Sequence, residues 1–144
     1  MHAIDKERVR RLMEELKNSL DMAVRTVGLS EDVFMGDVRN RYTLRLALVE
    51  VVESAVDIGL HVLRKDFGVD RVEGYLEIFR KLVQHGVLSH DVGVGMERLT
   101  RLRNLIIHRY WEVDDERMYR EARDSGLELI NRFVRELLAY VSGA

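Results

Sequence analysis

No proline occurs in this chain of 144 residues, and that absence constrains its fold more than any other feature. Proline ends or kinks helices, so a chain without it can form long uninterrupted ones. Apolar residues also recur at three- and four-residue steps, which is the period of an amphipathic α-helix. Connections between the expected helices are short, which favours antiparallel neighbours. The sequence therefore predicts an all-α, up-down helical bundle of four to five helices, forming one domain over 1–144.

Glycines and capping residues divide this helical pattern into segments. Asp5 and Gly28 can begin and end the first helix, because aspartate favours the N-cap and glycine the position after the last turn. The second long helix is apolar over much of its circumference from 44 to 63, which predicts a central position. The expected helical ranges are 5–27, 30–35, 37–66, 72–84, 89–110 and 115–141.

Two glycines fall within the helix that Ser89 is expected to cap. Glycine disfavours a helix interior by about 1 kcal/mol relative to alanine. Gly93 and Gly95 should therefore weaken the first turns, and we expect this helix to become regular only near Met96.

Composition excludes several classes of protein. The formal net charge of −2 argues against a protein that coats nucleic acid through bulk charge, although it permits a local phosphate-binding patch. The chain has no cysteine, which excludes disulfides and thiolate metal sites. The charged N-terminal residues lack the apolar core of a signal peptide, and no apolar run approaches the ~20 residues that cross a bilayer. We expect a cytoplasmic protein with no membrane partner.

The most unusual stretch of the sequence lies between 97 and 114. It holds a leucine and isoleucine repeat interrupted by many polar residues, and no acidic residue occurs between Arg98 and Arg109. A local cationic island with one imidazole, that of His108, suits chemistry on a polyanion. The alternative is that His108 caps the helix C-terminus while the arginines form surface ion pairs. Composition alone favours this alternative, and the local lack of acids keeps the functional interpretation open.

Helical spacing decides which of these polar residues share a face. Asn104 and His108 are four residues apart and should stack, with Arg101 on the same side. Arg103 lies about 140° round the helix from His108, so the two should not point the same way within one chain. A second copy of the helix could complete a site that contains both. Asn104 could hydrogen-bond one ring nitrogen of His108 and fix which nitrogen faces a substrate.

A second polar set follows the central helix at four-residue steps. Glu53, Asp57 and His61 would share a face, and carboxylates with histidine could ligate a metal, as in a ferritin-like bundle. Such a site needs a matching acidic stripe on another helix, for example an E-x-x-H pair, and the sequence contains none. We therefore expect no metal, and interpret these residues as a polar seam that pairs with arginines of the helix from 89 to 110.

The segment R-N-L-I-I-H-R-Y, from Arg103 to Tyr110, resembles the motif of the HepT-like toxins: arginine, four residues, histidine, any residue, tyrosine. These toxins belong to the HEPN superfamily of helical ribonucleases. Val113-Asp114, the segment A-V-D-I-G-L-H from 55 to 61 and the segment F-R-K-L-V-Q-H-G-V-L before the motif helix also resemble the family. The likeness covers most of the chain in the expected order.

This resemblance implies an HEPN-like bundle that acts as a metal-independent RNA endonuclease without a cofactor. Arg103 and His108 would be the catalytic pair, and Asn104 would support them by orienting the imidazole. The resemblance also implies a homodimer whose two motifs face a shared cleft. The arginines expected to bind RNA phosphates in that cleft are Arg98, Arg101 and Arg109.

A separate role is implied for Tyr110. The partner of many such toxins is an MntA-like nucleotidyltransferase antitoxin, which transfers AMP from ATP to the motif tyrosine. The chain would then be the toxin of a type VII-like toxin–antitoxin module, inactivated by AMPylation of Tyr110. The alternative is a non-catalytic HEPN-type module that only binds nucleotide or a partner protein.

Overall fold

The computed structural model describes residues 3–143, which contain helices and loops but no strand. The predicted all-α bundle is confirmed. Two short turns of other helix types, η1 (Tyr110–Glu112, 3₁₀) and η2 (Ala122–Gly126, π), interrupt the α-helical part of the chain. The α-helices are α1 (Lys6–Val27), α2 (Glu31–Gly36), α3 (Val38–Phe67), α4 (Tyr75–Gln84), α5 (His90–His108), α6 (Asp115–Glu121) and α7 (Leu127–Val141).

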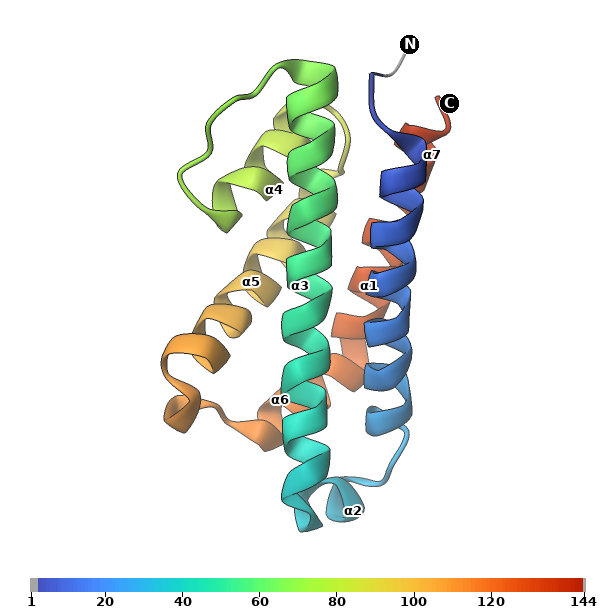
Figure 1. The fold of residues 1–144 in the computed structure, drawn as a ribbon. Coiled ribbons are helices and arrows are strands. Elements are labelled where there is room, and N and C mark those ends of the chain that lie inside the picture. The colour runs from blue at the N-terminus through green and yellow to red at the C-terminus, as the bar shows by residue number, and fades with distance from the viewer. Residues whose placement is uncertain (1–2, 144) are drawn as a thin grey trace.

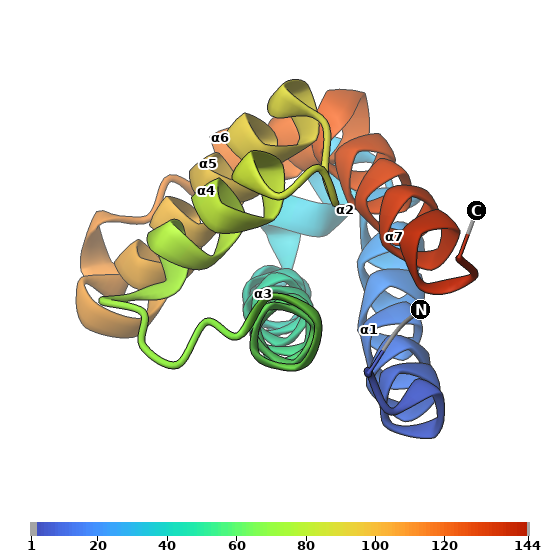
Figure 2. The ribbon, with the colours of Figure 1, turned by 90° about the horizontal axis from the view of Figure 1, so that it is seen from above.

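The long helix α3 occupies the centre of the bundle, as predicted. Figures 1 and 2 show α1 and α7 on one side of it and α4 and α5 on the other. Much of the circumference of α3 is buried, including Leu48, Val51 and Val52, while one stripe of the helix faces solvent. A Cβ at Gly59 would lie 3.0 Å or less from side-chain atoms of α4, so glycine allows α4 to pack tightly against α3. The burial of apolar surface around α3 is the main stabilising contribution to this arrangement.

The predicted helix boundaries hold at most ends. Asp5 caps α1 by accepting a hydrogen bond from the Arg8 N–H, and Gly68 ends α3 with a φ of 63°. The start of α4 was predicted three residues too early. Residues 69–74 form a loop, and the Glu77 carboxylate reaches back from the first turn to accept the Glu73 N–H at 2.6 Å. A glutamate at this position of the first turn favours a helix start there.

The expectation that α5 becomes regular only near Met96 is wrong, since the helix is continuous from His90. A Cβ at Gly93 would lie 2.3 Å from Val83 Cγ2, and one at Gly95 would lie 2.3 Å from Leu129 Cδ1. Both glycines therefore let α4 and α7 approach α5 closely. The packing that they permit outweighs the low helix propensity of glycine.

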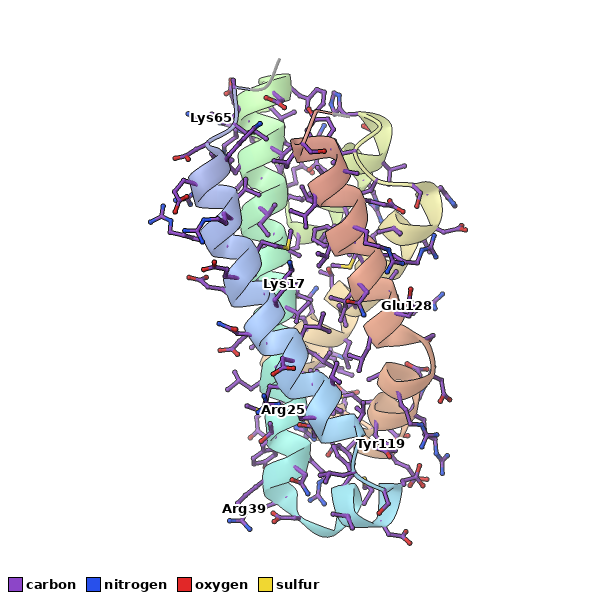
Figure 3. The ribbon with its side chains drawn as sticks, turned by 90° about the vertical axis from the view of Figure 1, so that its right-hand side faces the viewer. Lys17, Arg25, Arg39, Lys65, Tyr119 and Glu128 are labelled. Atoms are coloured by element: carbon purple, nitrogen blue, oxygen red, sulfur yellow. The ribbon has the colours of Figure 1, made fainter. Side chains whose placement is uncertain are left out.

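The last predicted helix, 115–141, is divided into α6 and α7 by the π turn η2. A Cβ at Gly126 would lie 3.3 Å from the Glu121 carbonyl oxygen, so glycine permits the close backbone approach in this π turn. Figure 3 shows α7 beside α1, with charged side chains such as Lys17 and Glu128 on the outer surface. None of the helices within 3–143 combines the length and apolar character that a membrane crossing requires.

Candidate active site at the end of α5

The motif residues lie where α5 ends, on the side of α3 away from α1 and α7 (Figure 1). His108 is exposed, so its imidazole is open to solvent and is not part of the core. Tyr110 is 60% exposed, and its ring meets the ring of Trp111 edge-on at 5.2 Å. Ile107 is also exposed. An imidazole, a phenol and apolar side chains are therefore displayed together at one end of the molecule.

The turn that carries Tyr110 is tied to the central helix through Arg45. The Arg45 guanidinium pairs with both carboxylate oxygens of Asp115, at 2.7 and 2.8 Å, and donates to the Tyr110 carbonyl at 3.2 Å. Arg41 lies 3.4 Å from the same carboxylate. The Arg45 and Asp115 side chains are only 13% and 11% exposed. Sequence analysis missed this pair, because 70 residues separate its members and no motif marks either.

Arg103 points inward, toward α3 and α4. Its Nε donates to Glu53 Oε1 at 2.7 Å, and its Nη1 donates to Asn104 Oδ1 at 3.0 Å. The guanidinium carbon also lies 4.8 Å from the centre of the Tyr75 ring. The Arg103 side chain is only 18% exposed. The structure thus brings Arg103 and Asn104 together. It directs Arg103 toward the bundle while His108 is exposed, which agrees with the prediction that the two side chains do not point the same way.

Asn104 contacts Arg103 through its side-chain oxygen. No hydrogen bond joins Asn104 to His108 in the part of the chain that the structure describes. The role of Asn104 in orienting the imidazole therefore stays a prediction.

The other motif arginines are distributed over more than one face. Arg101 lies 3.9 Å from Glu97, and Arg109 lies 3.5 Å from Glu112, so acids just outside the basic stretch partly neutralise it. Arg98 lines a separate groove of about 630 Å³ between α5 and the segment from η2 to α7. The structure therefore does not bring Arg98 beside Arg103 within one chain.

The proposed polar seam on α3 is confirmed at Glu53, which pairs with Arg103 of α5. His61 is engaged elsewhere: its Nε2 accepts the Asp5 N–H at 2.9 Å. Burial and the nearby Arg8 cation lower the pKa of His61, while burial and the Glu53 carboxylate raise the pKa of Asp57. Within 3–143, no three histidine, aspartate or glutamate side chains gather in a group that could hold a metal ion.

The fold and this end of α5 define a class of protein: an all-α bundle that presents an arginine–histidine–tyrosine motif where its penultimate long helix ends. Residues 6–137 match the family described as ribonuclease HepT-like. The chain belongs to this HepT-like ribonuclease family.

Two relatives share part of the sequence. A protein of Archaeoglobus fulgidus named “Putative RNase” is 36% identical over 69 residues, which are 48% of this chain and 51% of that protein. A protein of the same description from Methanocaldococcus jannaschii is 36% identical over 62 residues, covering 41% of this chain and 70% of the relative. The matched part thus spans about half the length of the first of these relatives.

Solved structures share the fold across almost the whole chain. A cytosolic protein of unknown function, YutE from Bacillus subtilis, superposes with a TM-score of 0.82 at 16% identity, covering 99% of this chain and 94% of that one. The Shewanella oneidensis HEPN toxin, tri-AMPylated and in complex with its MNT antitoxin, gives a TM-score of 0.82 at 18% identity. That match covers 91% of this chain and 96% of the toxin. The predicted HEPN-like fold is confirmed.

Proposed function

We propose that this protein is a metal-independent RNA endonuclease in which Arg103 and His108 are the catalytic residues. The observation that carries the proposal is the solvent-exposed imidazole at the end of α5, five residues after an arginine whose guanidinium is fixed by Glu53 and Asn104. Membership of the HepT-like ribonuclease family supports the same reaction class.

The chemistry requires only groups that the chain supplies. An imidazole can take the proton from a ribose 2′-OH or return one to the leaving 5′ oxygen. The 2′ oxygen then bonds to phosphorus while the bond from phosphorus to the 5′ oxygen breaks. Arg103 stabilises the negative charge that develops on the phosphoryl oxygens. The products are a 2′,3′-cyclic phosphate and a 5′-OH.

We further propose that two copies of the chain form the working enzyme. Arg103 and His108 face different directions in one chain, and a homodimer with adjoining α5 ends allows both to reach one phosphodiester. The exposed side chains of Ile107 and Trp111 offer apolar contact area for such an interface. Pairing would also bring two copies of Arg98, Arg101 and Arg109 near the RNA, where they bind phosphates.

Tyr110 is the proposed site of control by an MntA-like nucleotidyltransferase antitoxin. Its side chain is 60% exposed and follows His108 by two residues, so an attached AMP would lie beside the catalytic imidazole. The added phosphate would offset the local cationic charge, and the nucleotide would occupy space that RNA needs. The chain would then be the toxin of a type VII-like module in the cytoplasm. The HEPN toxin with the same fold is AMPylated in its complex with an MNT antitoxin, and YutE is cytosolic.

Cleavage of RNA in EDTA tests the nuclease proposal. The wild-type protein is expected to cut RNA without divalent metal, and His108→Ala should reduce the rate by about 10²–10⁴-fold. The matched control is His90→Ala, which removes an exposed histidine at the other end of the same helix. Equal cleavage by His108→Ala would refute the proposal. Saturable nucleotide binding by a wild-type protein that leaves RNA intact would favour the non-catalytic module instead.

A further inference from the structure

Three helices contribute to a small polar cluster around Arg103. Glu53 comes from α3, Tyr75 from the first turn of α4, and Arg103 from α5. Glu53 Oε1 accepts from Arg103 Nε at 2.7 Å, and Arg103 Nη2 lies 2.7 Å from the same oxygen. The Tyr75 hydroxyl donates to the other oxygen, Glu53 Oε2, also at 2.7 Å. Each carboxylate oxygen therefore has a partner on a different helix.

The hydrogen bond from Tyr75 restrains the orientation of the Glu53 carboxylate. The hydrogen bond from Tyr75 holds one oxygen of Glu53, so the other oxygen is kept facing Arg103. The same hydrogen bond, followed by burial, raises the pKa of Tyr75, which keeps the phenol protonated as a donor. The Tyr75 ring also packs under the guanidinium, 4.8 Å from its carbon, in a cation–π contact. Tyr75 therefore restrains Arg103 both directly and through Glu53.

The pattern of donors shows what the cluster leaves available. A guanidinium has five N–H groups, and the contacts to Glu53 and Asn104 use at most three of them. The remaining N–H groups belong to the terminal nitrogens Nη1 and Nη2. A guanidinium held in this way can still donate two hydrogen bonds from its terminal nitrogens to the oxygens of a phosphate.

We propose that Glu53 and Tyr75 are positioning residues, which orient the Arg103 guanidinium for the transition state of RNA cleavage. The inference rests on the proposed nuclease function and adds two residues to it. Neither residue touches the substrate. Their effect is to reduce the conformations of a long, flexible side chain to one, so that the guanidinium needs no reordering when charge develops on the phosphate.

A competing role for Glu53 would be to withhold Arg103 from RNA by neutralising it. The contacts favour positioning, because Glu53 lies against the Nε edge and one terminal nitrogen while donors on both terminal nitrogens remain free to bind. The two roles predict opposite changes in rate. A positioning carboxylate speeds cleavage, and its loss slows the reaction. A withholding carboxylate slows cleavage, and its loss speeds the reaction.

The test compares Glu53→Gln with Glu50→Gln. Glu50 lies one turn earlier on α3, and its carboxylate accepts from Ser19 of α1, so it is a matched control. Steady-state cleavage of a short quenched fluorescent RNA in EDTA separates kcat from KM. Glu53→Gln is expected to lower kcat by on the order of 10- to 100-fold with little change in KM. Tyr75→Phe should lower it less, because the ring stays under the guanidinium, and Glu50→Gln should leave it unchanged.

A kcat for Glu53→Gln at or above the wild-type value overturns the inference, as does an equal loss in Glu50→Gln. Thermal melting of each variant verifies folding. A second readout does not depend on catalysis: the Arg103 Nε–H signal in NMR, assigned by its absence in Arg103→Lys. We expect slow solvent exchange of this proton in the wild type and Glu50→Gln, and fast exchange in Glu53→Gln. An unchanged exchange rate of this proton in Glu53→Gln overturns the positioning role even if the protein cleaves no RNA. The nuclease proposal is tested separately, and it is upheld if the wild-type protein cleaves RNA and His108→Ala does not.

Discussion

The two halves of α5 differ in what surrounds them. The first half is enclosed: Val92, Met96 and Thr100 are buried, and Gly93 fits against the Val83 side chain of α4. The second half ends at the exposed His108, and the exposed Arg109 and Tyr110 follow it directly. One end of the helix therefore packs in the core, and the other exposes candidate site residues to solvent.

This difference shows how the bundle can position the candidate catalytic residues without burying them in the core. A rigid helix anchored by close packing positions side chains at its free end more accurately than a loop would. Arg103 lies in the second half, where its guanidinium still contacts α3 and α4. Substitutions in the two halves should consequently have separate effects, on stability in the first half and on activity in the second.

The largest expected effect is on activity, in the second half. Arg103→Lys keeps the charge but removes the forked donors that bind Glu53 and phosphate together. It should lower kcat for RNA cleavage by about 10²–10³-fold, which is typical for the loss of one transition-state hydrogen-bond donor. Urea unfolding of the variant should give a free energy close to that of the wild type. Full activity in Arg103→Lys would contradict the expectation that substitutions in the second half of α5 affect activity.

The next largest effect is on stability, in the first half. Gly93→Ala places a Cβ 2.3 Å from Val83 Cγ2, and the stiff valine cannot move away without backbone shifts. The free energy of unfolding should fall by about 1–3 kcal/mol, as for other overpacked cores, with the rate of cleavage by the folded fraction unchanged. Gly36→Ala is the matched control, since a Cβ there has nothing within 4 Å. Equal stability of Gly93→Ala and Gly36→Ala would show that the first half is loosely packed.

A smaller effect concerns the dependence of stability on pH, away from both halves. The His61 Nε2 accepts the Asp5 N–H, which requires a neutral imidazole, and the pKa of His61 in the folded chain is lowered. The unfolded chain therefore binds more protons, so this stabilisation is present above pH ~6.5 and is lost as pH falls. His61→Gln, whose amide oxygen can still accept, should show a smaller fall in melting temperature between pH 7 and 5. An identical fall in both proteins would show that His61 does not contribute.

The smallest effect on the protein alone is expected for Tyr110→Phe. The Tyr110 side chain is exposed, and the hydrogen bond that fixes its turn uses the backbone carbonyl, which the substitution keeps. Cleavage and stability should therefore match the wild type. Co-expression with an MntA-like nucleotidyltransferase should add AMP to the wild type and not to Tyr110→Phe, as measured by intact mass. Equal labelling of both would place the modification at another residue.

Helix periodicity and capping residues together predicted most of the fold, because caps such as Asp5 and Gly28 mark helix ends locally. The sequence could not show where packing overrides propensity. Gly93 indicates a weak helix by propensity, yet its lack of a side chain is what lets α4 approach α5. The π turn was also missed, because the apolar period on both sides of it is that of a continuous helix.

The candidate site was likewise predicted only in part from the sequence. The residues on α5 were found because they form a contiguous motif, and helical geometry correctly separated the directions of Arg103 and His108. The partners of that motif come from other helices. Glu53 was predicted as part of a polar seam, whereas the hydroxyl of Tyr75 gave no signal, since an aromatic residue in an apolar stripe predicts a core position.

The chemical nature of the RNA ends tests the central claim most directly. The wild-type protein in EDTA should cut RNA to fragments with a 2′,3′-cyclic phosphate and a 5′-OH. An otherwise identical oligonucleotide with a single 2′-deoxy ribose at the cleaved position should resist cleavage there. Both results follow if the 2′-OH is the nucleophile and His108 handles its proton. Products with 5′-phosphate ends, or equal cleavage at the 2′-deoxy position, would contradict the account.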